Sequence, residues 1–322
     1  MKKQEKQDRE EKQKELMEKL EEGIKAVFTS ERYAEYLKLM GKFHSYSFNN
    51  TILIQMQMPN ASYLAGYKAW ETLERHVKKG ERGIMILAPN QYKRMKEVEV
   101  FDPVTGKQKV DADGNLVTEQ KEIAYATFRP IAIFDISQTE GKPLPELAQE
   151  LHGDIKNYGM ILDAVKNTTS VPITFESWEG SKKGYYNFVE QRIGIKEGMS
   201  ELQTVKTAIH ELTHSVLHTD KDKLKDAATM EVEAESVAFV VCNHFGLDTS
   251  DYSFGYLAGW SSNRELPELK SSLQTIQKTA HDLIDRMEEE MLHLSKQIEC
   301  SENLDATRLS HVEVSNIHHH RR

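Results

Sequence analysis

One five-residue segment constrains this chain more than any other, because residues 210–214 read His-Glu-Leu-Thr-His. The surrounding residues 204–218 contain no Gly or Pro and repeat apolar side chains at helical spacing, so the sequence predicts a helix. On that helix His210 and His214 lie one turn apart on the same face, where two neutral imidazoles can share one Zn²⁺ ion. Glu211 is then placed to accept a proton from a water that the ion activates.

A catalytic zinc usually has a third protein ligand, and a second predicted helix offers candidates. Residues 230–242 read Met-Glu-Val-Glu-Ala-Glu-Ser-Val-Ala-Phe-Val-Val-Cys. Glu231 and Glu235 are four residues apart and share a face, so one can bind the metal while the other accepts the outward N–H of a ligand histidine. Glu233 points elsewhere and is expected to be solvated. The residues alone leave open which carboxylate is the ligand, and the alternative is a solvated acidic face on an ordinary helix.

Composition limits the classes of protein to which the chain can belong. At 322 residues it is long enough for two domains, and its net charge of −9 argues against a surface that coats nucleic acid everywhere. Cys242 and Cys300 do not resemble a disulfide framework, which favours a reducing compartment, the cytoplasm. No apolar run approaches the roughly eighteen residues of a membrane helix, and the first residues lack a secretion signal. Membrane insertion and export are therefore not expected.

The N-terminal half combines predicted helices with predicted strands. Residues 1–24 form a charged leader helix, and residues 25–145 form an α+β domain in which helices give way to two buried strands. Between the strands, the polar residues 93–127 contain two turn signals and predict a protruding, inserted β-hairpin. Residues 142–145 read Lys-Pro-Leu-Pro and predict a linker to the next domain.

Residues 150–262 are predicted to form the second domain, with strands that lead directly into the first metal helix. Zinc peptidases commonly hold peptide substrates by edge pairing to a strand in that position, so residues 192–195 are a candidate substrate shelf. Tyr252, Tyr256 and His218 are candidate hydrogen-bond donors to a developing oxyanion, with ordinary packing as the alternative.

The last part of the chain carries no predicted chemistry. Residues 263–299 repeat apolar side chains at helical spacing and predict one long amphipathic helix. Residues 300–322 are polar and are expected to be disordered.

Basic and aromatic residues gather in the first domain, which suggests a local nucleic-acid surface on an otherwise acidic protein. Lys and Arg would neutralise phosphates while aromatic rings stack on bases, a combination that suits single strands and weakens as salt rises. In the alternative reading, the rings are core residues and the basic turn is merely solvated. The residues concerned are Tyr67, Lys68, Trp70, Arg75, Lys78, Lys79 and Arg82.

Several segments resemble known families. Four segments are similar to the N-terminal domain of ArdC-type antirestriction proteins: Tyr-Ser-Phe-Asn-Asn-Thr-Ile-Leu-Ile at 46–54, Ala-Gly-Tyr-Lys-Ala-Trp at 65–70, Val-Lys-Lys-Gly-Glu-Arg-Gly-Ile at 77–84 and Phe-Arg-Pro-Ile-Ala-Ile-Phe-Asp at 128–135. The second predicted domain resembles the zinc metallopeptidase domain that follows it in that group, related to the ImmA/IrrE peptidases. The arrangement is most similar to LtrC-like proteins of conjugative elements. The predicted hairpin and the long C-terminal helix are departures from the family's core.

The resemblance implies an α+β fold in which a single-stranded-DNA-binding domain precedes a gluzincin-like zinc metallopeptidase domain. Gluzincins place the ligand Glu one turn before the acidic orienting residue, which implies Glu231 as the ligand and Glu235 as the orienting group. The implied function is antirestriction, or protection of incoming DNA, for a mobile element. Two alternatives stay open: a DNA-binding factor whose zinc is structural, and an ImmA-like regulatory protease that cleaves a repressor and uses its first domain for a protein partner.

Overall fold

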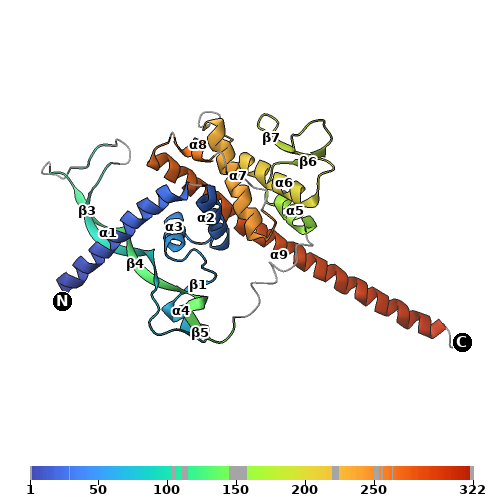
Figure 1. Ribbon diagram of the computed structural model, residues 1–322, viewed down its shortest axis with the longest axis horizontal. Helices are drawn as coiled ribbons and strands as arrows, with labels where there is room; N and C mark the ends of the chain where they lie inside the picture. The colour runs from blue at the N-terminus through green and yellow to red at the C-terminus, as the bar shows by residue number, and fades with distance from the viewer. Residues whose placement is uncertain are drawn as a thin grey trace. The chain divides into compact units, whose positions relative to one another are not determined.

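The computed structural model has the α+β fold that the sequence predicts (Figure 1). Its contacts divide the chain into two compact units. The first unit comprises Met1–Leu20 and Tyr63–Gly141, and the second comprises Glu21–Ser62 and Lys142–Arg322. The structure describes residues 2–28, 30–102, 106–110, 115–144, 158–219, 225–249, 254, 257–262 and 264–319.

The sheet of the first unit is antiparallel with strand order β1-β4-β3. Buried Ile84, Ile86 and Ile133 line its inner face, as expected for strands in which apolar side chains alternate across the pleat. A second, two-stranded sheet pairs β2 with β5. The elements are β1 (Leu64–Gly66), α4 (Tyr67–Thr72), β2 (Arg75–Val77), β3 (Ile84–Glu99), β4 (Thr118–Asp135), η1 (Ile136–Gln138) and β5 (Thr139–Gly141).

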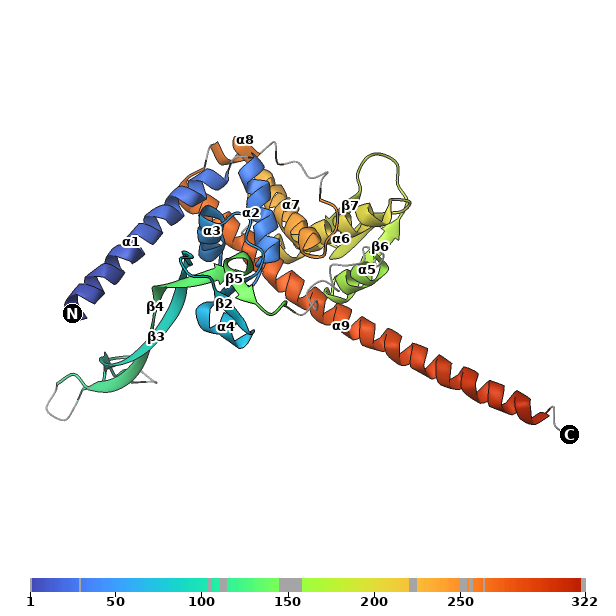
Figure 2. The same ribbon diagram turned by 60° about the horizontal axis from the view of Figure 1, so that its bottom comes forward.

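The predicted hairpin is confirmed as the outer half of a long two-stranded ribbon (Figure 2). β3 and β4 pair without interruption from Ile84 opposite Ile133 to Glu99 opposite Thr118. Most described side chains of the outer half are exposed, and the Lys93–Glu122 ion pair at 2.9 Å joins the two strands across one face. Cross-strand ion pairs of this kind favour one register in a ribbon that buries few apolar groups.

The second unit is mainly helical and contains a three-stranded sheet of order β6-β8-β7. β8 lies in the centre, parallel to β6 and antiparallel to β7. Its elements are α2 (Ser30–Lys42), α3 (Phe48–Gln57), α5 (Tyr158–Asn167), β6 (Ile173–Glu176), β7 (Gly184–Asn187), β8 (Arg192–Lys196), α6 (Glu201–Leu217), α7 (Ala227–His244), α8 (Leu257–Ser262) and α9 (Leu266–His319). Helix α1 (Lys2–Val27) crosses the division between the units.

Helix α7 organises the second unit because it is apolar on nearly every side. Most of its residues from Val232 to Cys242 are buried, so it must be surrounded by other elements. It packs against α2, α6 and α9. The Tyr33 hydroxyl on α2 lies 2.7 Å from the Ser236 hydroxyl on α7. Residues 21–62 therefore belong with the second unit, which differs from the expected domain boundary at residue 25.

The C-terminal region differs in detail from the sequence prediction. The predicted long helix is present as α9, but it continues to His319, where a disordered tail was expected from residue 300. The predicted linker at 142–145 is described only up to residue 144. Among the described residues, no helix combines the length and apolar character needed to cross a membrane.

Candidate metal centre

Helix α6 places two imidazoles side by side. Ser200 caps its N-terminus by accepting a hydrogen bond from the backbone N–H of Gln203, and one face of the helix is buried against the rest of the unit. The other face carries His210 and His214, whose Nε2 atoms lie 3.1 Å apart. This is the same-face arrangement that the four-residue spacing predicts.

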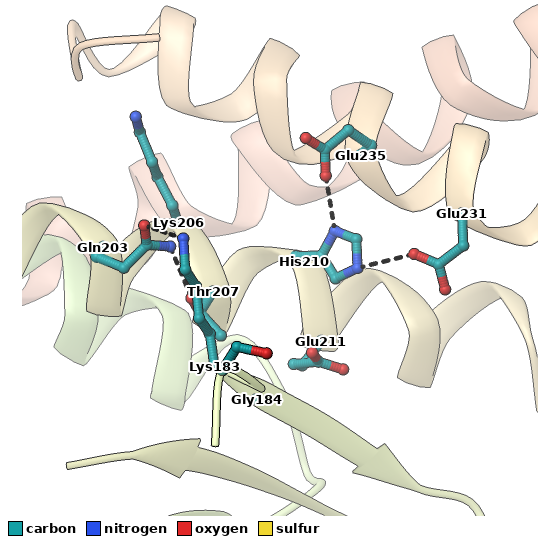
Figure 3. Close-up of a pocket in the computed structure, with 10 residues that line it drawn as sticks. Lys183, Gly184, Gln203, Lys206, Thr207, His210, Glu211, Glu231 and Glu235 are labelled. Atoms are coloured by element: carbon teal, nitrogen blue, oxygen red, sulfur yellow. Dashed lines mark hydrogen bonds and ion pairs between the residues drawn. The ribbon is translucent and has the colours of Figure 1, made fainter. Parts of the chain in front are cut away.

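Helix α7 brings carboxylates to these rings. Asp226 caps its N-terminus, accepting hydrogen bonds from the backbone N–H of Thr229 at 3.0 Å and from the guanidinium of Arg264 at 2.8 Å. The cap sets the position of the first turns, which hold Glu231 and Glu235 opposite α6 (Figure 3).

Three potential ligand atoms converge at this point. A Glu231 oxygen lies 3.6 Å from Nε2 of His210, the other lies 3.5 Å from Nε2 of His214, and one atom of each residue falls within 4.8 Å of the others. Tetrahedral Zn²⁺ with bonds of about 2.0–2.1 Å separates two ligand atoms by roughly 3.3 Å. The three side chains therefore fit a shared divalent ion without rearrangement of the helices.

A second carboxylate contacts the far side of the same ring. A Glu235 oxygen lies 3.4 Å from Nδ1 of His210, opposite the nitrogen that Glu231 approaches (Figure 3). Metal-ligating histidines usually donate their second N–H to such a partner, which fixes the tautomer and the ring orientation. The two carboxylates thus approach opposite nitrogens of one ring, and Glu231 also lies near His214.

His214 is supported by a buried chain of polar groups. Its Nδ1 lies 2.9 Å from Nδ1 of His218, whose Nε2 lies 3.5 Å from Glu233, and Glu233 pairs with Lys225 at 2.5 Å. The expectation of a solvated Glu233 is wrong, because this side chain is fully buried. Helical phase predicts that it points away from the metal, but not that His218, Lys225 and the rest of the unit cover it.

His218, an expected oxyanion donor, lines a cavity together with His210, Glu211 and His214, but its ring nitrogens face protein groups. Its two ring nitrogens face His214 and Glu233. The other two expected donors, Tyr252 and Tyr256, lie outside the described residues. Sequence reasoning missed Lys225, because it is one of three lysines in the charged residues 221–225, and nothing in the sequence distinguishes it from the other two.

The pKa values of His210 and His214 are shifted in opposite directions. Burial lowers the pKa of His210, but hydrogen bonds to Glu231 and Glu235 outweigh it and raise the pKa to about 9. Burial, and then the charge of His210, lower the pKa of His214 to about 4. Burial raises the pKa of Glu211 above its usual range. A divalent ion must displace the His210 proton, so metal binding is coupled to proton release.

A cleft of about 420 Å³ lies in front of the convergent groups. Strand β7 borders it, and the backbone N–H of Tyr186 on this strand donates to Glu211. A side chain at Gly184 would place its Cβ 2.5 Å from Thr207 and 3.0 Å from Cγ of Glu211, so only glycine permits this approach of strand to helix. The lining residues are Ser181, Lys183, Gly184, Gln203, Lys206, Thr207, His210, Glu211, Glu231 and Glu235.

The expected substrate shelf at residues 192–195 is wrong in position. These residues belong to β8, which is paired on both sides by β6 and β7, so its backbone groups are not available to a peptide. The edge strand of this sheet beside the cleft is β7. Order along the chain could not show which strand lies at the edge, because the strand nearest α6 in sequence lies in the middle of the sheet.

The predicted nucleic-acid residues of the first unit fall into two groups, of which the first is structural. Trp70 is fully buried and donates its indole N–H to a backbone carbonyl of β4 at 3.0 Å, so it is a core residue and not a base-stacking platform. Arg75 donates to the Thr139 side chain at 2.9 Å and lies over the Trp70 ring. Lys78 donates to a carbonyl of η1 at 2.8 Å from an exposed position.

The second group is exposed on the same unit. It consists of Tyr67, Lys68, Lys79 and Arg82, and Tyr67 also packs edge-on against Phe134 with ring centroids 6.3 Å apart. These four side chains keep the combination of cationic groups and an aromatic ring that the sequence suggested.

Comparison with known proteins identifies both parts of the chain. Residues 6–129 match the family described as the N-terminal domain of anti-restriction factor ArdC. Residues 168–242 match a peptidase family described as the IrrE N-terminal-like domain. The chain carries an ArdC-type N-terminal domain followed by an IrrE-like domain. The resemblance that the sequence motifs carried is thereby confirmed.

Individual relatives of this chain are distant. An uncharacterized protein of Bacillus anthracis is 27% identical over 313 residues, covering 89% of this chain and 53% of that protein. The chain thus spans about half the length of the curated relative that it matches. Two crystal structures of antirestriction ArdC from a plasmid are also similar. The metal-free form has a TM-score of 0.43 and 21% identity, covering 77% of this chain and 86% of that one. The Mn(II)-bound form has a TM-score of 0.43 and 18% identity, covering 76% and 85%.

Proposed function

We propose that the second unit is a metal-dependent peptidase in which His210, His214 and Glu231 hold a divalent ion and Glu211 is the general base. The observation that carries the proposal is the convergence of two imidazole nitrogens and one carboxylate within 4.8 Å, beside a cleft. Two nitrogen donors and one oxygen donor suit Zn²⁺, which in catalytic sites keeps a position for water.

An ion bound there would act as a Lewis acid on a water molecule and on the substrate carbonyl. Glu211 accepts the proton of the attacking water and passes it to the leaving amine. The burial that raises the pKa of this carboxyl suits it to both steps, because a catalytic base works best when its pKa approaches the working pH. Glu235 holds the His210 ring in the orientation that presents Nε2.

The substrate we propose is an extended peptide segment that pairs with the edge of β7. Among the described strands, only β8 pairs with β7, so the outer edge of β7 is open to such a partner apart from the Tyr186 N–H, which donates to Glu211. Gly184 brings this edge directly against Glu211, which places a bound peptide bond beside the base.

Replacement of Glu211 by Gln tests the proposal. The variant should bind metal with the stoichiometry of the wild type but cleave a peptide library about 10²–10⁴-fold more slowly, the usual loss when a general base is removed. Glu201→Gln, at an exposed position in the first turn of the same helix, should cleave normally. Undiminished cleavage by Glu211→Gln would overturn the proposed mechanism. If the metal-loaded wild type cleaves nothing in the library, the structural-metal alternative is favoured.

We further propose that the first unit binds single-stranded DNA and that the whole protein protects incoming DNA of a mobile element in the cytoplasm. The match to the ArdC N-terminal domain and the exposed Lys68, Lys79 and Arg82 beside Tyr67 support DNA binding.

Fluorescence anisotropy with an oligonucleotide at two salt concentrations tests this second part. Affinity should fall as salt rises, and the double variant Lys79→Ala/Arg82→Ala should reduce the slope of log affinity against log salt by about 1–2. Lys166→Ala on α5 should leave binding unchanged. An absence of salt-dependent binding would contradict the proposal and favour a regulatory protease with a protein partner.

A further inference from the structure

A second convergence of ligand-type side chains lies in the same unit, on elements that take no part in the first. His281 and Asp285 are one turn apart on α9, and His44 lies in the turn between α2 and α3. One ligand atom from each of the three residues falls within 4.8 Å of the others. The sequence marks α9 only as an amphipathic helix, because the third member of the group is more than two hundred residues away.

The distances within this group repeat those of the first site. Nε2 of His44 lies 3.3 Å from one oxygen of Asp285, and Nε2 of His281 lies 3.5 Å from the other. Both values are close to the roughly 3.3 Å that separates two ligands of a tetrahedral ion. The spacing of His281 and Asp285 also equals that of the two histidines on α6, which places both side chains on one helix face.

Each of the two imidazoles approaches the shared carboxylate through Nε2. Nδ1 of His44 and Nδ1 of His281 are buried and make no hydrogen bond within the described part of the chain. Asp285 is therefore the polar group toward which both rings are turned. Two imidazoles and one carboxylate that converge on a point supply three ligand atoms for one ion.

The backbone that carries His44 is held against α9. Gln277, one turn before His281, donates its side-chain amide to the carbonyls of His44 at 3.3 Å and Tyr46 at 2.8 Å. Positions 277, 281 and 285 thus lie on one face of α9, and all three face the turn between α2 and α3. Ligands on a backbone fixed in this way need little ordering when an ion binds.

A third histidine beside the group has other partners. The His244 ring lies 4.8 Å from that of His44, but its Nδ1 lies 2.8 Å from the Gly41 carbonyl and its Nε2 lies 2.8 Å from Glu288. Both of its nitrogens face oxygen acceptors, so the ligand set consists of His44, His281 and Asp285 alone. Glu288 adds negative charge next to the set, which favours a cation there.

We propose that His44, His281 and Asp285 form a second metal site that takes a divalent transition ion, Zn²⁺ by its two nitrogen donors and one oxygen donor. The side chains are part-exposed, 19% for His44, 35% for His281 and 51% for Asp285, so the ion keeps water at its remaining positions. The residue that follows His281, as Glu211 follows His210, is Asp282, whose side chain is exposed and does not repeat the buried base of the first site. The site therefore ties the turn between α2 and α3 to α9 and is structural.

Zinc titration of the metal-stripped full chain against a chromophoric chelator tests the proposal. The chain should carry Gln in place of His318, His319 and His320, so that these residues contribute no donors. We expect two equivalents in this background, one in Glu231→Gln and one in His281→Gln. In the Glu231→Gln background, Asp285→Asn should weaken the remaining equivalent at least about a hundredfold, more than loss of a group outside the ligand shell costs.

Matched controls lie on the same helix. His293→Gln and Asp282→Asn replace exposed side chains of α9 outside the group, and both should keep two equivalents. Zinc should also raise the melting temperature of Glu231→Gln but not of Glu231→Gln/His281→Gln, because an ion that binds only the native state stabilises it. The second site would be contradicted if the chain bound a single equivalent of zinc that Glu231→Gln abolished and His281→Gln left intact. That result would still be consistent with the first site.

Discussion

Nδ1 of His210 lies 3.4 Å from the carboxylate of Glu235. The opposite nitrogen of the same ring faces Glu231 at 3.6 Å, so two carboxylates one helical turn apart approach one imidazole from its two ends. Of the two nitrogens of His210, only Nε2, which faces Glu231, also lies next to Nε2 of His214. This relationship gives the two glutamates different predicted contributions to metal affinity.

In the His281→Gln background, Glu231→Gln should abolish the remaining equivalent of tightly bound metal, because it removes a ligand. Glu235→Gln should weaken binding about 10–100-fold, since the ring loses only its orienting partner. Competition with a chelator measures both affinities, and Glu201→Gln is the control. Equal losses in the two variants would contradict the separate roles.

The buried ion pair of Glu233 should contribute to stability. Lys225→Met leaves the Glu233 carboxylate buried without its cation, and we expect a loss of about 1–2 kcal/mol in the free energy of unfolding, discounted because the lysine side chain is 38% exposed. Lys225→Met/Glu233→Gln should lose less than the sum of the single changes, because the unpaired charge is gone. Urea unfolding measures all three. Lys166→Met, which breaks the more exposed pair with Asp163, should cost about 0–1 kcal/mol.

Gly184→Ala should separate activity from folding. The new Cβ would lie 3.0 Å from Cγ of Glu211, so β7 or the base must shift, and we expect peptide cleavage to fall about 10–100-fold while the chain stays folded. Gly159→Ala on α5, where a Cβ meets nothing within 4 Å, should keep full activity. Peptidase assays and melting curves on both variants check this. Wild-type rates in Gly184→Ala would show that the close strand contact is dispensable.

Asp226 should make stability depend on pH. The Thr229 hydroxyl, and further the guanidinium of Arg264, lower the pKa of Asp226 in the folded chain. The contribution of the Asp226 carboxylate to the free energy of unfolding is therefore complete above the pKa of the unfolded chain, about 3.9. It disappears as pH falls through the lower pKa of the folded chain.

Two replacements of Asp226 separate the cap from the charge. At pH 7, Asp226→Ala should cost about 1 kcal/mol as a lost N-cap, whereas Asp226→Asn should keep most of the cap. Urea unfolding at neutral and acid pH should show the gap between wild type and Asp226→Asn closing in acid. A gap that is constant with pH would contradict the assigned pKa direction.

Much of the metal centre could be predicted because its ligands follow from local helical periodicity. The same-face placement of His210 and His214, and of Glu231 and Glu235, depends only on a spacing of four residues. The β-hairpin and the long helix were also readable, since turn residues and a repeating apolar pattern act over short stretches. The ArdC-type resemblance added the pairing of the two domains, which no periodicity reveals.

Other properties required contacts between distant segments. Trp70 and Glu233 each carry a polar atom that sequence reasoning placed at the surface, but the fold supplies a β4 carbonyl for one and Lys225 for the other. A polar group can be buried wherever a hydrogen-bonding or charged partner lies beside it, and the packing of the fold decides which group that partner is. The position of β7 at the sheet edge likewise depends on strand order, which the chain order does not reveal.

By itself, the sequence determined which side chains share a helix face, and hence that this chain has a candidate metal site with a base beside it. The tertiary structure decided which carboxylate faces which nitrogen of His210, which strand borders the cleft, and that His44 meets His281 and Asp285. The reason is physical: periodicity sets the direction of a side chain relative to its own helix, whereas a ligand set spanning two helices exists only once burial of apolar faces has brought those helices together.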